Sequence, residues 1–304
     1  MAPLPAGAPP PWPPKRLPFA PSGAPGLGLN FNSSRVTLGD GGKAVDAELS
    51  DVSDIAFSPR GNLYLADGPR VREVNRSGII TTVAGNGGSA GVVREKPVLI
   101  KNGTRALAAP LGDANGLSIA FNTSGELYIG TNNQLLRLTR SGRLDTVPAV
   151  VRAGPQRGKT LNQFNDVAAS ASGDIYSSCG WQGWAIWLTT PGGRAGFVAY
   201  ARRSGGNCSV LQRGPGGAVY GELGPDLLRL TGHDYKVRYE STANYRVRYR
   251  FPEGFFLTYF AFGPRGIVYA DEIPGNMGFE ARQKLVEVRH GRLAVLWQEG
   301  GAAA

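Results

Sequence analysis

The chain has 304 residues, of which 41% are hydrophobic, so it can bury the core of one large domain or two. Its 44 glycines and 22 prolines favour many short strands joined by tight turns. No apolar run approaches the roughly 20 residues that span a bilayer, so no transmembrane segment is predicted. The net charge of +10 keeps acidic partners, including nucleic acid, among the candidates.

Residues 1–44 differ from the rest of the chain because they consist mostly of Pro, Ala, Gly and Leu. Such a composition cannot form a packed core and is typical of polyproline-like or disordered segments. We therefore predict a low-complexity segment at 1–44 and a folded domain at 45–304. Prolines interrupt every apolar stretch near the N-terminus, so the segment shows no recognisable secretory signal.

The fold prediction is based on a segment that recurs along the chain. Five stretches align without gaps, and each ends in an apolar residue followed by Tyr, with Gly three residues before that Tyr. They are IAFSPRGNLY (55–64), IAFNTSGELY (119–128), VAASASGDIY (167–176), LQRGPGGAVY (211–220) and FAFGPRGIVY (260–269). Their spacing of 44 to 64 residues is typical of β-propeller blades. The sequence therefore predicts an all-β propeller with five four-stranded antiparallel blades.

Each copy shows the same succession of strands and turns. In the first copy, strands are expected at 54–57, 63–66, 70–74 and 79–84, with a glycine-containing turn after the first and the third. Residues 26–44 could add one or two strands of a further blade. Six blades are therefore the alternative count.

Residues 39–87 contain the stretches GDGG, GNLYLAD, RVREV and GIITTVAGNG, in this order. This arrangement resembles an NHL repeat of the bacterial type. The second copy shares less of the pattern, and the later copies share only its first two strands. Proteins of the NHL family are usually six-bladed propellers and some bind RNA, so the resemblance also implies nucleic acid as a candidate ligand.

A second resemblance concerns the tunnel of the propeller. Residues 163–176, QFNDVAASASGDIY, are similar to a segment of the SMP-30/gluconolactonase group, and Asn165 matches a residue at the metal and substrate site of that group. Asn115, in ANGLSIAF, matches a metal ligand. The resemblance implies a Ca²⁺ ion held by Asn115, Asn165 and a carboxylate, either Asp51 or Glu48. A metal-dependent, lactonase-like hydrolase is therefore the alternative function.

The long connections fall on one face of the predicted propeller. The turns after the first and third strands of each copy are mostly tight, whereas the connections at 85–112, 180–183, 201–207 and 271–282 are longer. Binding sites are usually built from elaborated loops on a rigid scaffold. We therefore predict a module that binds a protein, peptide or glycan at the tunnel mouth on this face. The predicted ligand-contacting residues are Asn115, Asn165, Asn207, Trp181, Asp271 and Glu272.

The two cysteines belong to neighbouring copies. Cys179 ends the second strand of copy three and Cys208 begins copy four, both on the side of the long connections. A disulfide between them requires Cα atoms within about 7 Å and would indicate an oxidising compartment, extracellular or periplasmic. Two free thiols are the alternative, and the compartment stays open.

Arginine and tyrosine alternate near the end of copy four. The arginines are Arg238, Arg246, Arg248 and Arg250. Such a pattern can bind phosphates and stack on bases, but it also suits a solvent-exposed outer strand, which is the favoured interpretation. The sequence contains only two histidines and none of the common hydrolase motifs, so a conventional catalytic triad is not predicted.

Overall fold

The computed structural model describes residues 39–298 except 89–91, 94–95, 98, 113–115, 153–156, 163, 179–184, 201–209, 224–225, 231–244, 252–254, 264–266, 275–283 and 290–291. Within these described residues, no helix is long and apolar enough to cross a membrane.

The described chain consists almost entirely of short strands. They are β1 (Val52–Phe57), β2 (Leu63–Asp67), β3 (Arg70–Val74), β4 (Ile80–Ala84), β5 (Val92–Val93), β6 (Lys96–Pro97), β7 (Thr104–Arg105), β8 (Ser118–Phe121), β9 (Leu127–Gly130), β10 (Leu135–Leu138), β11 (Arg143–Val147), β12 (Val150–Val151), β13 (Asp166–Ala169), β14 (Ile175–Ser178), β15 (Ala185–Thr189), β16 (Arg194–Tyr200), β17 (Leu211–Arg213), β18 (Val219–Leu223), β19 (Asp226–Leu230), β20 (Tyr245–Arg250), β21 (Phe255–Phe262), β22 (Val268–Pro274), β23 (Lys284–Arg289) and β24 (Arg292–Gln298). The described 3₁₀ helices are η1 (Ala44–Asp46), η2 (Ala106–Ala108) and η3 (Pro215–Gly217).

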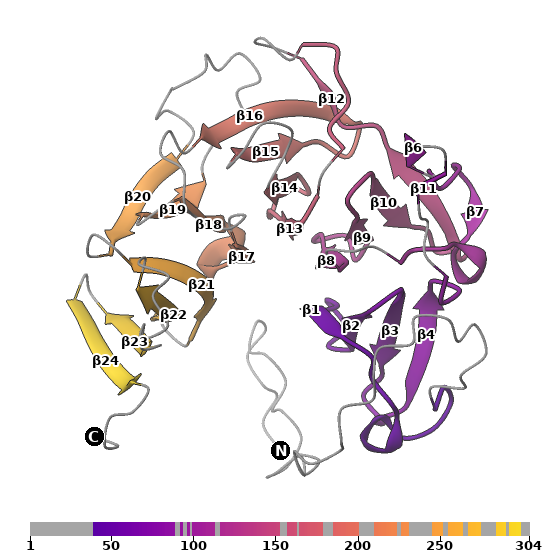
Figure 1. The fold of residues 1–304 in the computed structure, drawn as a ribbon, viewed down its shortest axis with the longest axis horizontal. Helices are drawn as coiled ribbons and strands as arrows, with labels where there is room; N and C mark the ends of the chain where they lie inside the picture. Colours follow the sequence, from indigo (N-terminus) through magenta and orange to yellow (C-terminus); the bar gives the residue numbers. More distant parts are fainter. Residues whose placement is uncertain are drawn as a thin grey trace, which may run out of the picture.

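Five blades stand side by side around a common centre (Figure 1). In chain order they are β1–β4, β8–β11, β13–β16, β17–β20 and β21–β24, and consecutive strands are antiparallel neighbours in each blade. The two-residue strands β7 and β12 add a fifth strand to the rim of the second and third blades. The prediction of a propeller with five four-stranded blades is confirmed.

The two faces of the propeller differ in their connections. Figure 1 shows β1, β8, β13 and β17 nearest to the centre, and the last strand of each blade near the rim. The turns from first to second strand and from third to fourth strand share one face, which we call the tight-turn face. The connections from second to third strand and from one blade to the next share the other face, which we call the long-connection face.

The hydrophobic core lies between the blades, with one buried cluster between each pair of blades that follow each other in the chain. The repeated tyrosine contributes to these clusters. Tyr64 packs edge-on against Phe121 of the second blade with ring centroids 4.8 Å apart, and Tyr220 packs against Phe262 of the fifth blade at 4.5 Å. In the first four copies the Tyr therefore marks the side of the blade that packs against the next one, which explains why the repeat retains a large aromatic residue.

The repeated glycine has a conformational cause. Gly61, Gly125, Gly173 and Gly217 lie in the turns that follow the first strand, with φ values of 81°, 77°, 87° and 73°. Glycine adopts this left-handed conformation without steric cost, whereas a residue with a Cβ atom does not. The turn geometry therefore accounts for the glycine three residues before the tyrosine.

Gly85, directly after β4, is the glycine for which a substitution should cost most. Its φ is 94°, and a Cβ atom would lie 2.2 Å from the carbonyl oxygen of Pro69 and 2.8 Å from Cα of Arg70. Backbone atoms cannot rotate away, so we expect Gly85→Ala to lower the free energy of unfolding by about 2 to 3 kcal/mol in urea titrations. Gly78→Ala is the control, because Gly78 has φ 75° but no atom within 4 Å of a Cβ. Equal losses in the two variants would contradict the clash at Gly85.

Candidate functional site

Polar side chains link the innermost strands of successive blades. In β1, Asp54 Oδ2 accepts hydrogen bonds from Ser118 Oγ at 2.9 Å and from the backbone N–H of Ile119 at 2.7 Å. In β13, Asp166 Oδ2 accepts a hydrogen bond from the N–H of Leu211 at 2.6 Å. The innermost strands of neighbouring blades are not paired as a sheet. These side chains therefore satisfy backbone donors that no strand ladder reaches.

Ser118 lies between the two carboxyl groups. Its Oγ is 2.9 Å from Asp54 Oδ2 and 3.1 Å from Asp166 Oδ1, and it accepts a hydrogen bond from the N–H of Val167 at 2.9 Å. A hydroxyl has one proton, so Ser118 can donate to only one carboxylate. The other contact is satisfied when the second carboxyl is protonated and donates to Ser118 Oγ. The geometry therefore fits one proton shared by the pair.

The pKa values of both aspartates are raised. Burial is the largest cause at Asp54 and raises its pKa to about 6, against the hydrogen bonds from Ile119 and Ser118, which lower it. Burial also raises the pKa of Asp166 well above its ordinary value, and the negative charge of Asp54 raises it further. Two carboxylates in one buried site cannot both ionise easily, so Asp54 ionises near pH 6 and Asp166 then keeps the proton that the pair shares.

A further carboxyl group lies at the same level of the fourth blade. The N–H of Glu222 in β18 donates to the carbonyl of Val210, whose position in its repeat matches that of Asp54, Ser118 and Asp166. Glu222 is 4% exposed, and burial raises its pKa to about 8. We call Asp54, Ser118 and Asp166 the carboxyl layer; Glu222 lies on the second strand of its blade, at the position of Ala66, which packs between the first two blades. General acids and bases work best with pKa values near the operating pH, which this layer provides.

The carboxyl layer lies toward the long-connection face. Ser118 and Asp166 are the first residues of β8 and β13, which the connections between blades enter directly. Asp54 is the third residue of β1 and pairs with Ala66 near the end of β2. A ligand that approaches the tunnel from the long-connection face would therefore meet this layer near the mouth.

Two of the predicted site residues lie close to this layer along the chain. Asn165 directly precedes Asp166 and is half-buried, and its Oδ1 atom is buried. Asp51 stands before β1 with an exposed side chain, and its backbone N–H donates to Asp67 Oδ1 at 3.3 Å. The structure thus keeps Asp51 on the surface and places Asn165 at the start of an innermost strand.

The other predicted site residues divide into two groups. Asp271 and Glu272 belong to β22, and Asp271 pairs with Tyr259, so its backbone has the register in the fifth blade that Glu222 has in the fourth. Outside the described residues lie Asn115, Asn207, Trp181, Cys179 and Cys208. The full ligand-contacting set and the disulfide therefore stay predictions.

The described residues do not fit a calcium site. Among them, no group of three or more His, Cys, Asp or Glu side chains could hold a metal ion. Ca²⁺ takes six to eight oxygen ligands, whereas the oxygens of Asp54 and Asp166 are already engaged by Ser118 and by backbone N–H groups. The predicted ion would also require Asn115, which the structure does not describe.

The carboxyl layer was not predicted from the sequence, although the repeat alignment contains a signal for it. The residue directly before each aligned stretch is, in order, Asp54, Ser118, Asp166, Val210 and Tyr259. A hydrogen-bonding residue thus precedes the aligned stretch in three successive copies. The carboxylates predicted for the metal site, Asp51 or Glu48, belong to the loop before the first strand, whereas Asp54 and Asp166 lie within the strands themselves.

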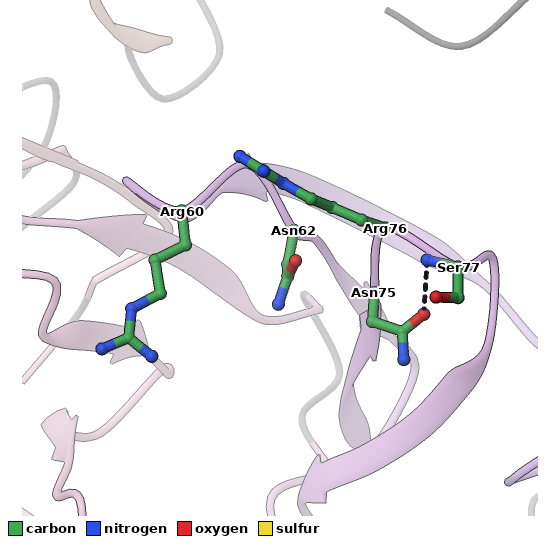
Figure 2. Close-up of a pocket in the computed structure, with 5 residues that line it drawn as sticks. All are labelled: Arg60, Asn62, Asn75, Arg76 and Ser77. Carbon is green, nitrogen blue, oxygen red and sulfur yellow. Dashed lines mark hydrogen bonds between the residues drawn. The ribbon is translucent and has the colours of Figure 1, made fainter. Parts of the chain in front are cut away.

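A hollow of about 500 Å³ lies on the tight-turn face of the first blade. Figure 2 shows its lining residues from two adjacent turns: Arg60, Asn62, Asn75, Arg76 and Ser77. Asn75 Oδ1 accepts a hydrogen bond from the N–H of Ser77 at 2.9 Å, which orders one of the turns. The two guanidinium groups make this hollow basic, in contrast to the carboxyl layer toward the other face.

The arginine-rich strand lies at the rim. Arg246 and Arg248 are exposed on β20, the outermost strand of the fourth blade. Arg250 forms two hydrogen bonds with the Asp226 carboxylate, at 2.7 and 2.9 Å. Arg238 lies outside the described residues. These described arginines are therefore separated from the tunnel by the other strands of their blade.

All five blades follow the repeated strand pattern, and the first blade contains the NHL-like stretches. Together these features define an NHL-type β-propeller. The family model of the teneurin NHL domain matches residues 26–177, which is half of the chain. The chain therefore belongs to the teneurin NHL domain family.

Individual relatives agree with this assignment. Teneurin-1 of Gallus gallus is 30% identical over 116 residues, which are 38% of this chain and 4% of that protein. Teneurin-3 of Mus musculus is 30% identical over 159 residues, which are 49% of this chain and 6% of that protein. The chain thus matches a small part of much longer proteins.

Among solved structures, the gluconolactonase XC5397 from Xanthomonas campestris is similar with a TM-score of 0.50. The alignment covers 82% of this chain and 76% of that chain at 15% sequence identity. At this identity the similarity concerns the propeller fold alone.

Proposed function

We propose that this propeller is a protein-binding module that holds its partner on the long-connection face, at the mouth of the tunnel. The observation that carries the proposal is the structure of the connection between the first two blades. It contains β5, β6, β7 and η2, whereas the turns of the opposite face are a few residues long. A rigid blade scaffold with elaborated connections on one face is how repeat folds usually present binding surfaces.

An exposed leucine provides an apolar contact point on this face. Leu99 is 53% exposed and precedes Ile100, whose N–H donates to Gln134 Oε1 at 2.6 Å while its carbonyl accepts from Gln134 Nε2 at 3.0 Å. Gln134 lies between the second and third strands of the second blade, so these bonds hold Leu99 at the long-connection face. The fully buried core of a protein interface is more apolar than the rest of the protein surface, so an exposed leucine suits such a position. A protein or peptide partner therefore fits better than a glycan.

The proposal predicts which variants lose binding. After a partner has been selected from an array of purified protein domains, Leu99→Asp should weaken its affinity by about tenfold or more in surface plasmon resonance. Val247→Asp is the matched control, because Val247 is 47% exposed but lies on the rim strand β20. Arg60→Glu serves the same purpose on the tight-turn face. Loss of binding in either control with none in Leu99→Asp would contradict the proposal.

Acid–base hydrolysis of a lactone is the second candidate, and the raised pKa values of Asp54 and Glu222 are the observation that favours it. The assay is hydrolysis of a panel of aldono- and aryl-lactones, with Ca²⁺ and with chelator. If the chain is a binding module, wild-type protein and the Asn165→Ala variant should both show no turnover above background. Turnover that disappears in Asp54→Asn or Glu222→Gln would replace the binding proposal with the acid–base hydrolase, and chelator-sensitive turnover that disappears in Asn165→Ala would replace it with a metal-dependent one.

A further inference from the structure

The outer edges of the first three blades are partly covered by short segments of the chain. In the second and third blades, β7 pairs with β11 and β12 pairs with β16. In the first blade, the N–H of Gly41 donates to the carbonyl of Ile80 at 2.8 Å, and the N–H of Ile80 donates to the carbonyl of Gly42 at 3.1 Å. These pairings satisfy backbone groups that an outermost strand otherwise presents to solvent.

The outermost strand of the fifth blade, β24, has no such cover in the part of the chain that the structure describes, where it pairs with β23 alone. In the other blades the covering segment precedes the blade that it covers. Only four residues separate Arg250 of β20 from Phe255 of β21. β21 lies three strands inside β24, a distance of about 14 Å that four extended residues barely span, so none of them is left to pair with β24.

The uncovered edge is apolar and almost free of charge. The sequence of β24 is RLAVLWQ, and Arg292 is its only charged residue. Val295 is 46% exposed and Leu296 is 44% exposed. Proteins usually protect exposed edge strands with charged residues, proline or a covering segment. β24 has none of these between its ends, so its edge favours pairing with another strand.

The distribution of charge favours a second copy of β24 as that strand. Symmetric antiparallel pairing about Val295 places Arg292 opposite Gln298. Pairing about Ala294 places Arg292 opposite Leu296. In neither register does a charged residue face a like charge, which would destabilise the pair.

The outermost strand of the fourth blade, β20, does not have this self-complementarity. Symmetric pairing about Val247 places Arg246 opposite Arg248. Pairing about Arg248 places Arg246 opposite Arg250. Two copies of a chain with a net charge of +10 repel each other, so they should meet where basic residues are sparse. β24 fits this requirement and β20 does not.

We propose that β24 is a dimerisation edge, which pairs antiparallel with β24 of a second copy about a two-fold axis. The contact joins two four-stranded blades into one sheet of eight strands. Because the same strand is used on both sides, the assembly closes as a dimer and does not extend into a filament. β24 lies at the rim in Figure 1, so this contact is separate from the proposed binding site at the tunnel mouth.

Sedimentation velocity of the full chain over a range of concentrations tests the dimer. We expect a monomer–dimer equilibrium with a dissociation constant at or below about 100 µM. Val295→Lys should weaken dimerisation by at least about tenfold, because a lysine on an edge strand opposes pairing. Val247→Lys is the matched control, since it adds the same charge to an exposed valine of β20, and it should change the dissociation constant by less than about twofold. Amides of residues 292–298 should also exchange faster on dilution, whereas those of residues 245–250 should not.

Three results would overturn the proposal. The wild-type chain could remain monomeric up to about 100 µM, which needs no variant and would leave the edge to an extended segment of another protein. A dimer that is insensitive to Val295→Lys would place the contact on another surface. Equal weakening by Val295→Lys and Val247→Lys would attribute the effect to the added charge and not to the strand.

Discussion

At about pH 8, the Asp54→Asn variant should be more stable than the wild-type chain by about 2 to 3 kcal/mol, whereas at about pH 4 the two should be equally stable. The side-chain oxygen introduced by this substitution can accept from Ser118 Oγ and from the N–H of Ile119, as Asp54 Oδ2 does. The amide carries no charge, so the variant avoids the cost of burying the Asp54 carboxylate, which the wild-type chain bears above about pH 6. Urea unfolding across this pH range measures the difference.

The sign of this difference in stability follows from the raised pKa of Asp54. The unfolded chain releases this proton near its ordinary pKa of 3.8, whereas the folded chain retains it up to about 6. The contribution of the Asp54 proton to stability is therefore complete below the unfolded pKa and is lost as the pH rises through about 6. Asp51→Asn is the control, because Asp51 is exposed. Parallel pH profiles for Asp54→Asn and wild type would refute the raised pKa of Asp54.

The second substitution with a large expected effect on stability is at Arg72. This fully buried guanidinium lies 3.4 Å from the buried Asp67 carboxylate, and it donates to the carbonyl of Glu48 at 2.8 Å. Arg72→Leu should lower the free energy of unfolding by about 3 to 5 kcal/mol, because it leaves the charge of Asp67 buried without its cation. It should also accelerate amide exchange in residues 44–51, which this arginine helps to hold.

The second blade provides the compensating change. Leu136 and Thr131 occupy there the positions that Arg72 and Asp67 occupy in the first blade. The double variant Asp67→Thr/Arg72→Leu should therefore recover more than half of the stability lost in Arg72→Leu. Unfolding of Arg72→Leu at the same urea midpoint as the wild-type chain would show that the ion pair does not stabilise the fold. A double variant that is less stable than Arg72→Leu would lead to the same conclusion.

The alignment of the repeats predicted the blades because each repeated residue is required by the geometry of its own blade or by its contact with the next blade. Gly61 has a positive φ, and Tyr64 packs against the next blade, so both recur in every copy. The burial of Arg72 could not be predicted from the repeat. Its charged side chain alternates with apolar residues and looks solvent-exposed in sequence, and its burial depends on a segment about 30 residues upstream.

The carboxyl layer was not predicted for a related reason. Asp54 and Asp166 bond to backbone groups of the following blades, at sequence separations of 65 and 45 residues. No pattern within one repeat reports such a contact. Asn165, by contrast, lies two residues before an aligned stretch, and it directly precedes the innermost strand β13.

Amide hydrogen exchange with and without a bound partner tests the proposed binding face most directly. The partner should slow exchange at residues 99–101, 131–134 and 164–165, which belong to connections on the long-connection face. Residues 58–62 and 75–79, the turns that line the basic hollow, should exchange at the same rate in both samples. Slower exchange at those two turns, with no change at the three connections, would contradict binding on the long-connection face.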